Sequence, residues 1–349
     1  MAHSLRIPSW ARRIGSRLLP APPIVSQGVH PDPLDPATAP PMREHRPRAE
    51  REALDSTEMA WFRASLLLPG VLSVRDAIVD DLSSYSGLTP EECVHRCLTW
   101  ESWSVAEWQT ADRSSPAGLR DFYLTTQSWA FDLMWYAYLQ AEGYVAAASV
   151  LALRAIPASR PGRDHLDFGS GAGFTSQLFA RAGYQVTLAD VSTTLMDFAR
   201  HRLSRRGVAA RYIDLNDDKL EVGRYDVITA LDALTHVPDL AEVAASLHGA
   251  LRPGGWLVAN FDVRPPTPES AWHLYEDDLK LRAVMHRTGF APRGRFGSFT
   301  VYRRQEPSGL RWRLRLLCDR VFLTSPPRRL ARRSRQRLAT VAHRIVSGQ

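Results

Sequence analysis

Cysteine, lysine and long hydrophobic runs are all scarce in this chain of 349 residues. Three cysteines cannot form a disulfide framework, so the sequence predicts a protein of a reducing compartment, the cytoplasm. The longest uncharged apolar run, Tyr144 to Leu153, is well short of the roughly 18 residues that a membrane-spanning helix requires. The composition is otherwise that of a globular protein, with 44% hydrophobic and 23% charged residues, which excludes a wholly disordered or collagen-like chain.

Positive charge is concentrated near the C-terminus. Residues 311–349 contain eleven arginines and one acid, Asp319, and so carry +10 of charge in a chain whose net charge is +7. The first 310 residues therefore carry a charge of −3. Apolar residues also recur at helical spacing in this segment. The default interpretation is a solubilising or disordered tail. The second interpretation of the tail is a peripheral membrane anchor. Residues 310–349 would then bind the anionic inner face of the membrane. Nucleic acid is a less favoured partner, because the tail contains no recognisable reading module.

Composition divides the chain into four segments. Residues 1–56 hold ten of the 24 prolines and too few apolar residues for a core, which predicts a disordered leader. Residues 57–156 have a helical pattern, residues 157–304 alternate short strands with helices, and residues 305–349 form the Arg-rich tail. No apolar block follows the first arginines, so we do not expect a secretory signal, although the absence of acids before Asp32 resembles a transit peptide.

The helical segment contains two well-marked helix starts, at Thr89 and at Ser115. Each of these residues can cap a helix and is followed by a proline, and Glu92 completes a capping box at the first start. We expect the second helix to continue from Ser115 through Tyr136. Six of the ten tryptophans lie in this segment, a density more typical of a core than of a binding site.

One group of candidate metal ligands also lies in the helical segment. Cys93 and Cys97 share a side of the expected helix, whereas His95 points roughly 200° away from them. A second pair of ligands at suitable spacing is missing from the sequence. We therefore predict no metal site.

Residues 157–304 have the pattern of a parallel sheet. Short apolar strands alternate with helical stretches such as Thr175–Arg181 and Leu195–Arg206. The expected strands are His165–Phe168, Gln185–Ala189, Ala209–Ile213, Tyr225–Leu231 and Trp256–Phe261. Parallel neighbours need crossover connections, which are normally right-handed. The predicted fold class is α/β, a doubly wound, mostly parallel sheet with helices on both faces and a helical N-terminal cap.

A glycine-rich turn joins the first expected strand to a helix. The sequence there is Asp167-Phe168-Gly169-Ser170-Gly171-Ala172-Gly173-Phe174. Glycines allow a sharp turn and close approach of a ligand, and the start of the helix offers unpaired N–H groups and the positive end of its dipole. This arrangement predicts a nucleotide or nucleoside site.

Two acids end the neighbouring strands, where ligands of open parallel sheets bind. Asp190 closes the second strand, 21 residues after Gly169, and is placed to accept both hydroxyls of a ribose. Asp214 closes the third strand, although the acids and amide that follow it at 216–218 compete for the same role. For both acids, the alternative to ligand binding is an ordinary role in capping the ends of their strands. The 21-residue spacing also suits a dinucleotide-binding fold, so an NAD(P)-dependent oxidoreductase is a rival interpretation.

Four further features favour a different family. Asp167 stands two residues before the first glycine. Of three later motifs, the first enters the fourth strand, the second follows that strand and the third turns into the fifth. These motifs are Tyr225-Asp226-Val227-Ile228, Asp232-Ala233-Leu234-Thr235-His236-Val237-Pro238-Asp239 and Leu251-Arg252-Pro253-Gly254-Gly255. Together, over about residues 164–304, they resemble the class I, Rossmann-like, S-adenosylmethionine-dependent methyltransferases.

The resemblance implies a seven-stranded sheet, with Phe296–Arg303 as the last, edge-forming strand pair, and S-adenosylmethionine as the cofactor. It places Asp190 at the ribose of the cofactor, and Asp214 with Leu215 at the adenine. The residues that it assigns to the methionine end of the cofactor are Asp167, Gly169, Gly171 and Gly173.

The expected reaction is transfer of a methyl group to a small-molecule, glycan or lipid-linked acceptor, with O-transfer favoured over N- or C-transfer. Candidate bases are His236 and Asp232, although His236 is equally explained as a packed histidine. We expect Tyr123, Trp129 and His273 to line the substrate pocket. A non-catalytic protein that retains the cofactor pocket for regulation is an alternative. The sequence does not indicate the acceptor or the oligomeric state.

Overall fold

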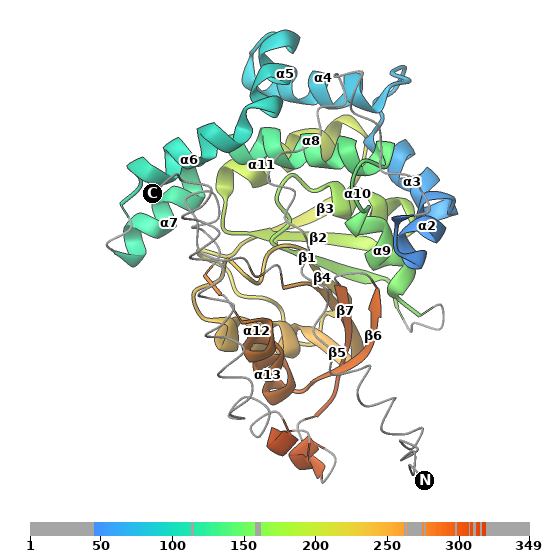
Figure 1. Cartoon of the computed structure of the whole chain (residues 1–349), viewed down its shortest axis with the longest axis vertical. Helices are drawn as coiled ribbons and strands as arrows, with labels where there is room; N and C mark the ends of the chain where they lie inside the picture. The colour runs from blue at the N-terminus through green and yellow to red at the C-terminus, as the bar shows by residue number, and fades with distance from the viewer. Residues whose placement is uncertain are drawn as a thin grey trace, which may run out of the picture.

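The computed structural model places a helical N-terminal region on one side of a single twisted sheet (Figure 1). The described residues are 45–112, 115–157, 162–261, 263, 274–275, 277–296, 299–306, 308–309, 312–314 and 316–318. Residues 1–44, His273 and the chain beyond Cys318 lie outside this set. The predicted leader and the predicted membrane association of the tail therefore stay predictions.

Eight helices precede the first strand in the described part of the chain. Their bounds are α2 Arg48–Leu54, α3 Thr57–Leu66, α4 Val74–Ser86, α5 Pro90–Leu98, α6 Trp100–Thr110, α7 Pro116–Thr125, α8 Ser128–Glu142 and α9 Ala148–Ala155. The capping box at the start of α5 is confirmed: the Thr89 hydroxyl accepts from the Glu92 backbone N–H, and the Glu92 carboxylate accepts from that of Thr89. On α5, Cys93 and Cys97 are buried and His95 is exposed.

Helix α2 begins before residue 57, so the predicted end of the disordered leader is wrong. The side chain of Arg46, just before α2, is 6% exposed and donates to the backbone carbonyls of Gly143 and Tyr144. These carbonyls lie in the turn between α8 and α9. A contact between residues nearly one hundred positions apart leaves no periodic pattern in the local sequence, which explains why the composition of this stretch was misleading.

The helix expected to run from Ser115 through Tyr136 is broken in the structure. Ser115 does cap α7, accepting from the backbone N–H of Gly118, but α7 ends at Thr125 and α8 begins at Ser128. The Glu107 carboxylate on α6 accepts from the Thr126 hydroxyl at 2.7 Å, and from the backbone N–H groups of residues 127 and 128. The half-buried Glu107 carboxylate thus satisfies two backbone N–H groups at the start of α8, which partly compensates for the break.

Seven strands form one sheet in the order β3-β2-β1-β4-β5-β7-β6. Their bounds are β1 Asp164–Phe168, β2 Gln185–Asp190, β3 Ala210–Asp214, β4 Tyr225–Ala230, β5 Leu251–Ala259, β6 Phe290–Phe296 and β7 Phe299–Arg304. The first five strands are parallel, and β7 pairs antiparallel with both β5 and β6. The predicted fold class is confirmed.

The closing strand pair is longer than predicted. The expected range, Phe296–Arg303, covers only β7 and the turn before it, whereas the hairpin starts at Phe290. Pro292 and a register shift next to it interrupt the alternating pattern of β6, which is why this strand was not recognised from its sequence. Because β7 lies between β5 and β6, the order also differs from the six parallel strands of the dinucleotide-binding fold.

The remaining helices complete the layers on the two faces of the sheet (Figure 1). They are α10 Phe174–Arg181, α11 Thr193–Arg205, α12 Leu240–Ala250 and α13 Asp278–Thr288. Alternate strand residues face opposite sides: Leu188 and Val227 pack with α10, α11 and the N-terminal helices, whereas Leu166 and Ile228 pack with α12 and α13. The N-terminal helical region is therefore part of one of the two main hydrophobic cores, not an appendage.

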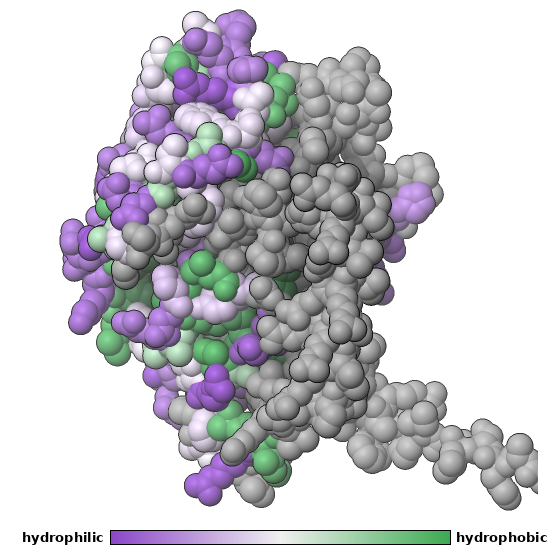
Figure 2. All heavy atoms as spheres, turned by 60° about the vertical axis from the view of Figure 1, so that its left-hand side comes forward, coloured by the Kyte–Doolittle hydropathy of each residue, from purple (hydrophilic) through white to green (hydrophobic). Residues whose placement is uncertain are grey.

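The described surface mixes hydrophilic and hydrophobic residues, as the face in Figure 2 shows. Its most exposed large apolar side chains, Leu72 and Val222, belong to different loops. Among the described helices, we find none with the length and apolar character required to cross a bilayer.

Candidate active site

The glycine-rich turn lies directly between β1 and α10, as predicted. Gly169 and Gly173 have φ values of 67° and 76°, a region that residues with a side chain rarely adopt. A Cβ atom on Gly169 would lie 2.5 Å from the Cβ of Ala233, in the loop after β4. The glycine at 169 therefore allows two loops at the carboxyl edge of the sheet to approach closely.

The turn has free hydrogen-bonding capacity for a ligand. The N-cap residue of α10 is Gly173, which has no side chain, so the first N–H groups of the helix are not satisfied by a capping side chain. The Ser170 hydroxyl is buried and has no hydrogen-bond partner among the described residues. An anionic or hydroxyl-bearing ligand would satisfy both kinds of group.

Asp190 holds the turn from the end of β2. One carboxylate oxygen accepts from the backbone N–H of Gly171 at 2.8 Å, and the other accepts from that of Ser192 at 2.9 Å. Burial raises the pKa of Asp190, and the backbone donors partly oppose this effect. Because each carboxylate oxygen can accept more than one hydrogen bond, these contacts orient the group and still leave acceptor capacity for ribose hydroxyls.

Asp214 lies beside Asp190, because the two residues are paired in the register of β2 and β3. Its carboxylate accepts from the backbone N–H and the side-chain amide of Asn216, at 2.9 and 2.7 Å. The backbone N–H of Leu215 donates to the Asp190 carbonyl at 3.0 Å. The structure therefore brings Asp190, Asp214 and Leu215 together at one edge, with Asn216 orienting the second acid.

Asp167 belongs to a buried network beneath the turn. Its two oxygens accept from the hydroxyls of Thr229 and Ser176, both at 2.9 Å. The Thr229 oxygen in turn lies 2.9 Å from Nε2 of His165, so it accepts from an Nε2–H imidazole. Burial raises the pKa of Asp167 to about 7, and burial lowers that of His165 to about 3. The imidazole is neutral, and the carboxyl titrates near neutral pH.

His165, Thr229 and Ser176 were not predicted as members of this network. A usable signal was present for His165, because residues two apart in a strand point to the same face and His165 is two residues before Asp167. Ser176 and Thr229 reach the carboxylate from α10 and β4, and nothing in their local sequence marks that contact.

The candidate base Asp232 follows β4 in a constrained conformation. It is the one residue other than glycine with a positive φ, 53°, in the described part of the chain. Its backbone N–H donates to Oδ1 of Asn260 at 2.7 Å, and the Asn260 amide donates back to the Asp232 carboxylate. Asn260, which directly follows β5, was not predicted. Backbone strain of this kind is often found at functional sites.

His236 lies in the same loop after β4. Its backbone N–H donates to the Ala233 carbonyl at 3.1 Å. This hydrogen bond closes a tight turn over residues 233–236, directly after Asp232. The backbone N–H of Leu274 donates to the Thr235 carbonyl at 3.0 Å, so Leu274 contacts this turn. His273, the residue before Leu274, lies outside the described residues.

Tyr123 and Trp129 pack together in an aromatic cluster with Trp108 and Phe122. Their ring centroids are 5.4 Å apart, and burial raises the pKa of Tyr123 to about 12. The cluster connects to the cofactor edge, because the Leu124 carbonyl accepts from the Thr194 hydroxyl at 2.8 Å, close to Asp190 in the chain. The contact of these two aromatic residues with a substrate stays a prediction.

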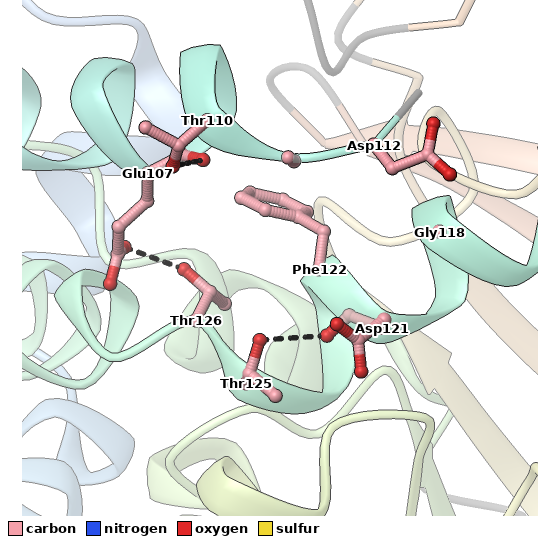
Figure 3. Close-up of a pocket in the computed structure, with 9 residues that line it drawn as sticks. Glu107, Thr110, Asp112, Gly118, Asp121, Phe122, Thr125 and Thr126 are labelled. Atoms are coloured by element: carbon pink, nitrogen blue, oxygen red, sulfur yellow. Dashed lines mark hydrogen bonds between the residues drawn. The ribbon is translucent and has the colours of Figure 1, made fainter. Parts of the chain in front are cut away.

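A small cavity lies next to this cluster, between α6 and α7 (Figure 3). Its volume is about 260 Å³, and the residues that line it include Glu107, Asp112, Asp121 and Phe122. Neither Tyr123 nor Trp129 lines it. Glu107 already caps α8, and the cavity includes none of the predicted site residues.

The chain matches known methyltransferases over the part that forms this site. A family described as a methyltransferase domain matches residues 166–259. The ubiquinone biosynthesis O-methyltransferase of Bordetella avium is 32% identical over 168 residues, which are 42% of this chain and 69% of that protein. The Pseudomonas aeruginosa protein of the same name is 35% identical over 108 residues, 30% of this chain and 47% of that protein. The chain thus spans less than half the length of the second relative.

Solved structures with a similar arrangement are more distant in sequence. Phosphoethanolamine N-methyltransferase 2 of Haemonchus contortus, in complex with S-adenosyl-L-methionine, is 22% identical, with a TM-score of 0.40, and covers 49% of this chain and 44% of that chain. An S-adenosylmethionine-dependent methyltransferase of Mesorhizobium loti is 21% identical, with a TM-score of 0.37, and covers 45% of this chain and 98% of that one. On the sequence matches to the methyltransferase domain and to the B. avium enzyme, this chain belongs to the class I S-adenosylmethionine-dependent methyltransferases.

Proposed function

We propose that this enzyme methylates an oxygen atom of a small-molecule, glycan or lipid-linked acceptor. The observation that carries the proposal is the close approach of the loop after β4 to the glycine turn, at Gly169 and Ala233. This approach places the loop of Asp232 and His236 next to the turn that binds the cofactor. The O-methyltransferase names of the relatives support transfer to oxygen rather than to nitrogen or carbon.

The residues of the turn and of the strand ends bind and orient the cofactor in this proposal. S-adenosylmethionine supplies an already activated methyl group on a sulfonium. Asp190 accepts from the ribose, and Asp214 with Leu215 contacts the adenine. Ser170 and the start of α10 offer donors to the methionine end, where Asp167 faces the ammonium. Alignment and exclusion of water contribute roughly 7 to 11 kcal/mol at best, which makes positioning the largest part of catalysis.

A base in the loop after β4 removes the acceptor proton. His236 or Asp232 takes the hydroxyl proton as the oxygen attacks the methyl carbon in line and the bond from that carbon to sulfur breaks. General base catalysis adds about 10² to 10⁴-fold, on the order of 3 to 5 kcal/mol. Asn260 holds Asp232 in place through both its amide and its carbonyl oxygen.

Binding of the demethylated cofactor is the first test of the proposed function. We expect saturating S-adenosylhomocysteine to raise the melting temperature, because a ligand that binds only the folded state stabilises it in proportion to its saturation. NAD serves as the control, and we expect it to leave the melting temperature unchanged. A shift with NAD alone would instead support the oxidoreductase.

Substitution of the candidate bases separates catalysis from binding. We expect His236→Ala or Asp232→Asn to lower turnover about 10² to 10⁴-fold, with S-adenosylhomocysteine affinity within about twofold of wild type. His95→Ala, on the exposed side of α5, is the matched control and should retain full turnover. If both loop variants turn over at the wild-type rate, neither residue is the base. If wild type binds the cofactor but methylates no hydroxyl, amine or carbon acceptor tested, the non-catalytic alternative is favoured.

A further inference from the structure

A fully buried arginine joins the glycine turn to the N-terminal helical region. Arg202, on α11, has no exposed side-chain surface. Its guanidinium donates through Nη1 to the carbonyl of Ala172, inside the turn, and through Nη2 to Oε1 of Gln177 on α10 at 2.8 Å. Its Nε donates to the carboxylate of Asp81 on α4 at 3.1 Å. One side chain therefore ties together three elements that are distant in the sequence.

The ion pair with Asp81 keeps this arginine charged inside the protein. Burial lowers the pKa of Arg202 to about 10, and the Asp81 carboxylate opposes the shift. The guanidinium is therefore protonated at neutral pH and can use all its donors. An arginine that makes three directed contacts in a dry environment fixes its partners more firmly than a surface pair does.

The contact to Ala172 bears on the conformation of the turn. The Ala172 carbonyl and the Gly173 N–H belong to the same peptide unit, and this N–H donates to the Ser170 carbonyl at 2.9 Å. Fixing the carbonyl fixes the plane of that peptide, just before the first turn of α10. Asp190 holds the turn at a second point, the N–H of Gly171. Glycines on either side of Ala172 give the turn little intrinsic rigidity. These two side-chain contacts therefore add to the backbone hydrogen bonds that hold its shape.

We propose that Arg202 is a positioning residue that holds the glycine turn in its cofactor-binding conformation and, through Asp81, makes cofactor affinity depend on the N-terminal helical region. The inference rests on the cofactor site of the proposed function. Asp81 is 121 positions away from Arg202 and outside the segment matched by the methyltransferase family. The N-terminal helices thus contribute to cofactor binding, in addition to any contact with the acceptor.

Arg206 provides a matched control. It also pairs with Asp81, at 2.7 Å, and its side chain is 5% exposed. Its other contacts are the backbone carbonyls of Leu66 and Arg202, at 2.6 and 3.1 Å. It donates to neither Ala172 nor Gln177 in any contact that the structure records. Arg206→Lys therefore disturbs the same buried acid without releasing the turn.

The experiment compares the full-length Arg202→Lys and Arg206→Lys proteins. Titration calorimetry measures S-adenosylhomocysteine affinity, thermal unfolding measures stability, and steady-state kinetics separate KM from kcat. We expect Arg202→Lys to weaken affinity at least tenfold and to raise the KM for S-adenosylmethionine. Its kcat at saturating cofactor and its KM for the acceptor should stay near wild type. Arg206→Lys should lower the melting temperature by a similar amount and keep affinity within about twofold.

Each outcome decides the inference. Wild-type affinity in Arg202→Lys, or equal losses of affinity in both variants, would show that the arginine is only structural. If Arg202→Lys does not fold, Asp81→Asn tests the same link: affinity at least threefold weaker supports it, and wild-type affinity overturns it. If the wild-type protein itself does not bind S-adenosylhomocysteine, the proposed function is wrong. If the wild type binds but Arg202→Lys binds equally well, only the inference about Arg202 is wrong.

Discussion

Asp190→Ala lowers the affinity for S-adenosylhomocysteine at least a hundredfold while the protein remains folded. The substitution removes the acceptor for two ribose hydroxyls, and it also releases the N–H of Gly171. Hydrogen bonds to a charged group contribute about 1.5 to 3 kcal/mol each, so the loss of two corresponds to a factor of about 10² to 10⁴. Burial already disfavours the charged form of Asp190, so removal of the carboxylate costs the unliganded fold less than the complex. Titration calorimetry measures the effect directly.

Asp197→Ala is the control for this prediction. Asp197 is an exposed acid on α11, and its carboxylate accepts from Arg200 on the same helix. We expect its removal to change the affinity by less than about twofold. If Asp190→Ala binds as tightly as wild type, Asp190 caps the end of its strand and does not hold the ribose.

The sequence was informative wherever a feature depended on neighbours along the chain. The predicted bounds of the five parallel strands lie within a few residues of the observed bounds, with one exception. Strand β5 starts at Leu251 rather than at the predicted Trp256. The acids Asp190 and Asp214 were expected at one edge because parallel strands end on the same side of a sheet, and the register confirms that they are paired. The start of α5 was predictable because a capping box is local.

Features that depend on distant contacts could not be predicted in the same way. The break between α7 and α8 depends on Glu107, a residue on another helix about twenty positions away. The two supports of the site, Arg202 beneath the turn and Asn260 beside Asp232, act across even larger separations. Patterns of polarity identify which face of an element is buried, but they do not identify the partner of a buried polar group. The helical region therefore looked like a separate cap, although it packs in one core with α10, α11 and Ala172 of the glycine-rich turn.

Asp167→Asn stabilises the free protein at pH 8 and weakens cofactor binding. The pKa of Asp167 in the folded protein, about 7, is above the usual value of 3.8 for an aspartate. Because the pKa is higher in the folded state than in the unfolded state, the protonated carboxyl stabilises the folded protein. This stabilisation is fully present below about pH 4 and is lost as the pH rises to about 7. At pH 8 the ionised carboxylate therefore opposes folding, by an amount on the order of 2 to 4 kcal/mol. Asparagine carries no such charge, and the Ser176 hydroxyl can accept from its amide.

The affinity of the same variant should change in the opposite direction. The ammonium of the cofactor's methionine end loses a buried carboxylate partner, so we expect S-adenosylhomocysteine to bind about 10- to 100-fold more weakly at pH 8. Wild-type affinity should fall about tenfold for each pH unit below 7, as Asp167 takes up a proton, whereas the affinity of the variant should be nearly independent of pH in that range. Calorimetry at pH 5.5, 6.5 and 8 and urea unfolding at the same pH values measure both effects.

Asp226→Asn distinguishes this effect from the general consequence of neutralising a buried acid. Asp226 is 3% exposed, as Asp167 is, but its carboxylate pairs with Arg252 at 2.6 Å. Its neutralisation should therefore destabilise the protein at pH 8 and leave cofactor affinity within about twofold of wild type. Destabilisation of Asp167→Asn at pH 8 would mean that the Thr229 and Ser176 hydroxyls stabilise the carboxylate more than burial penalises it. Wild-type affinity in that variant would mean that Asp167 supports the turn without contacting the cofactor.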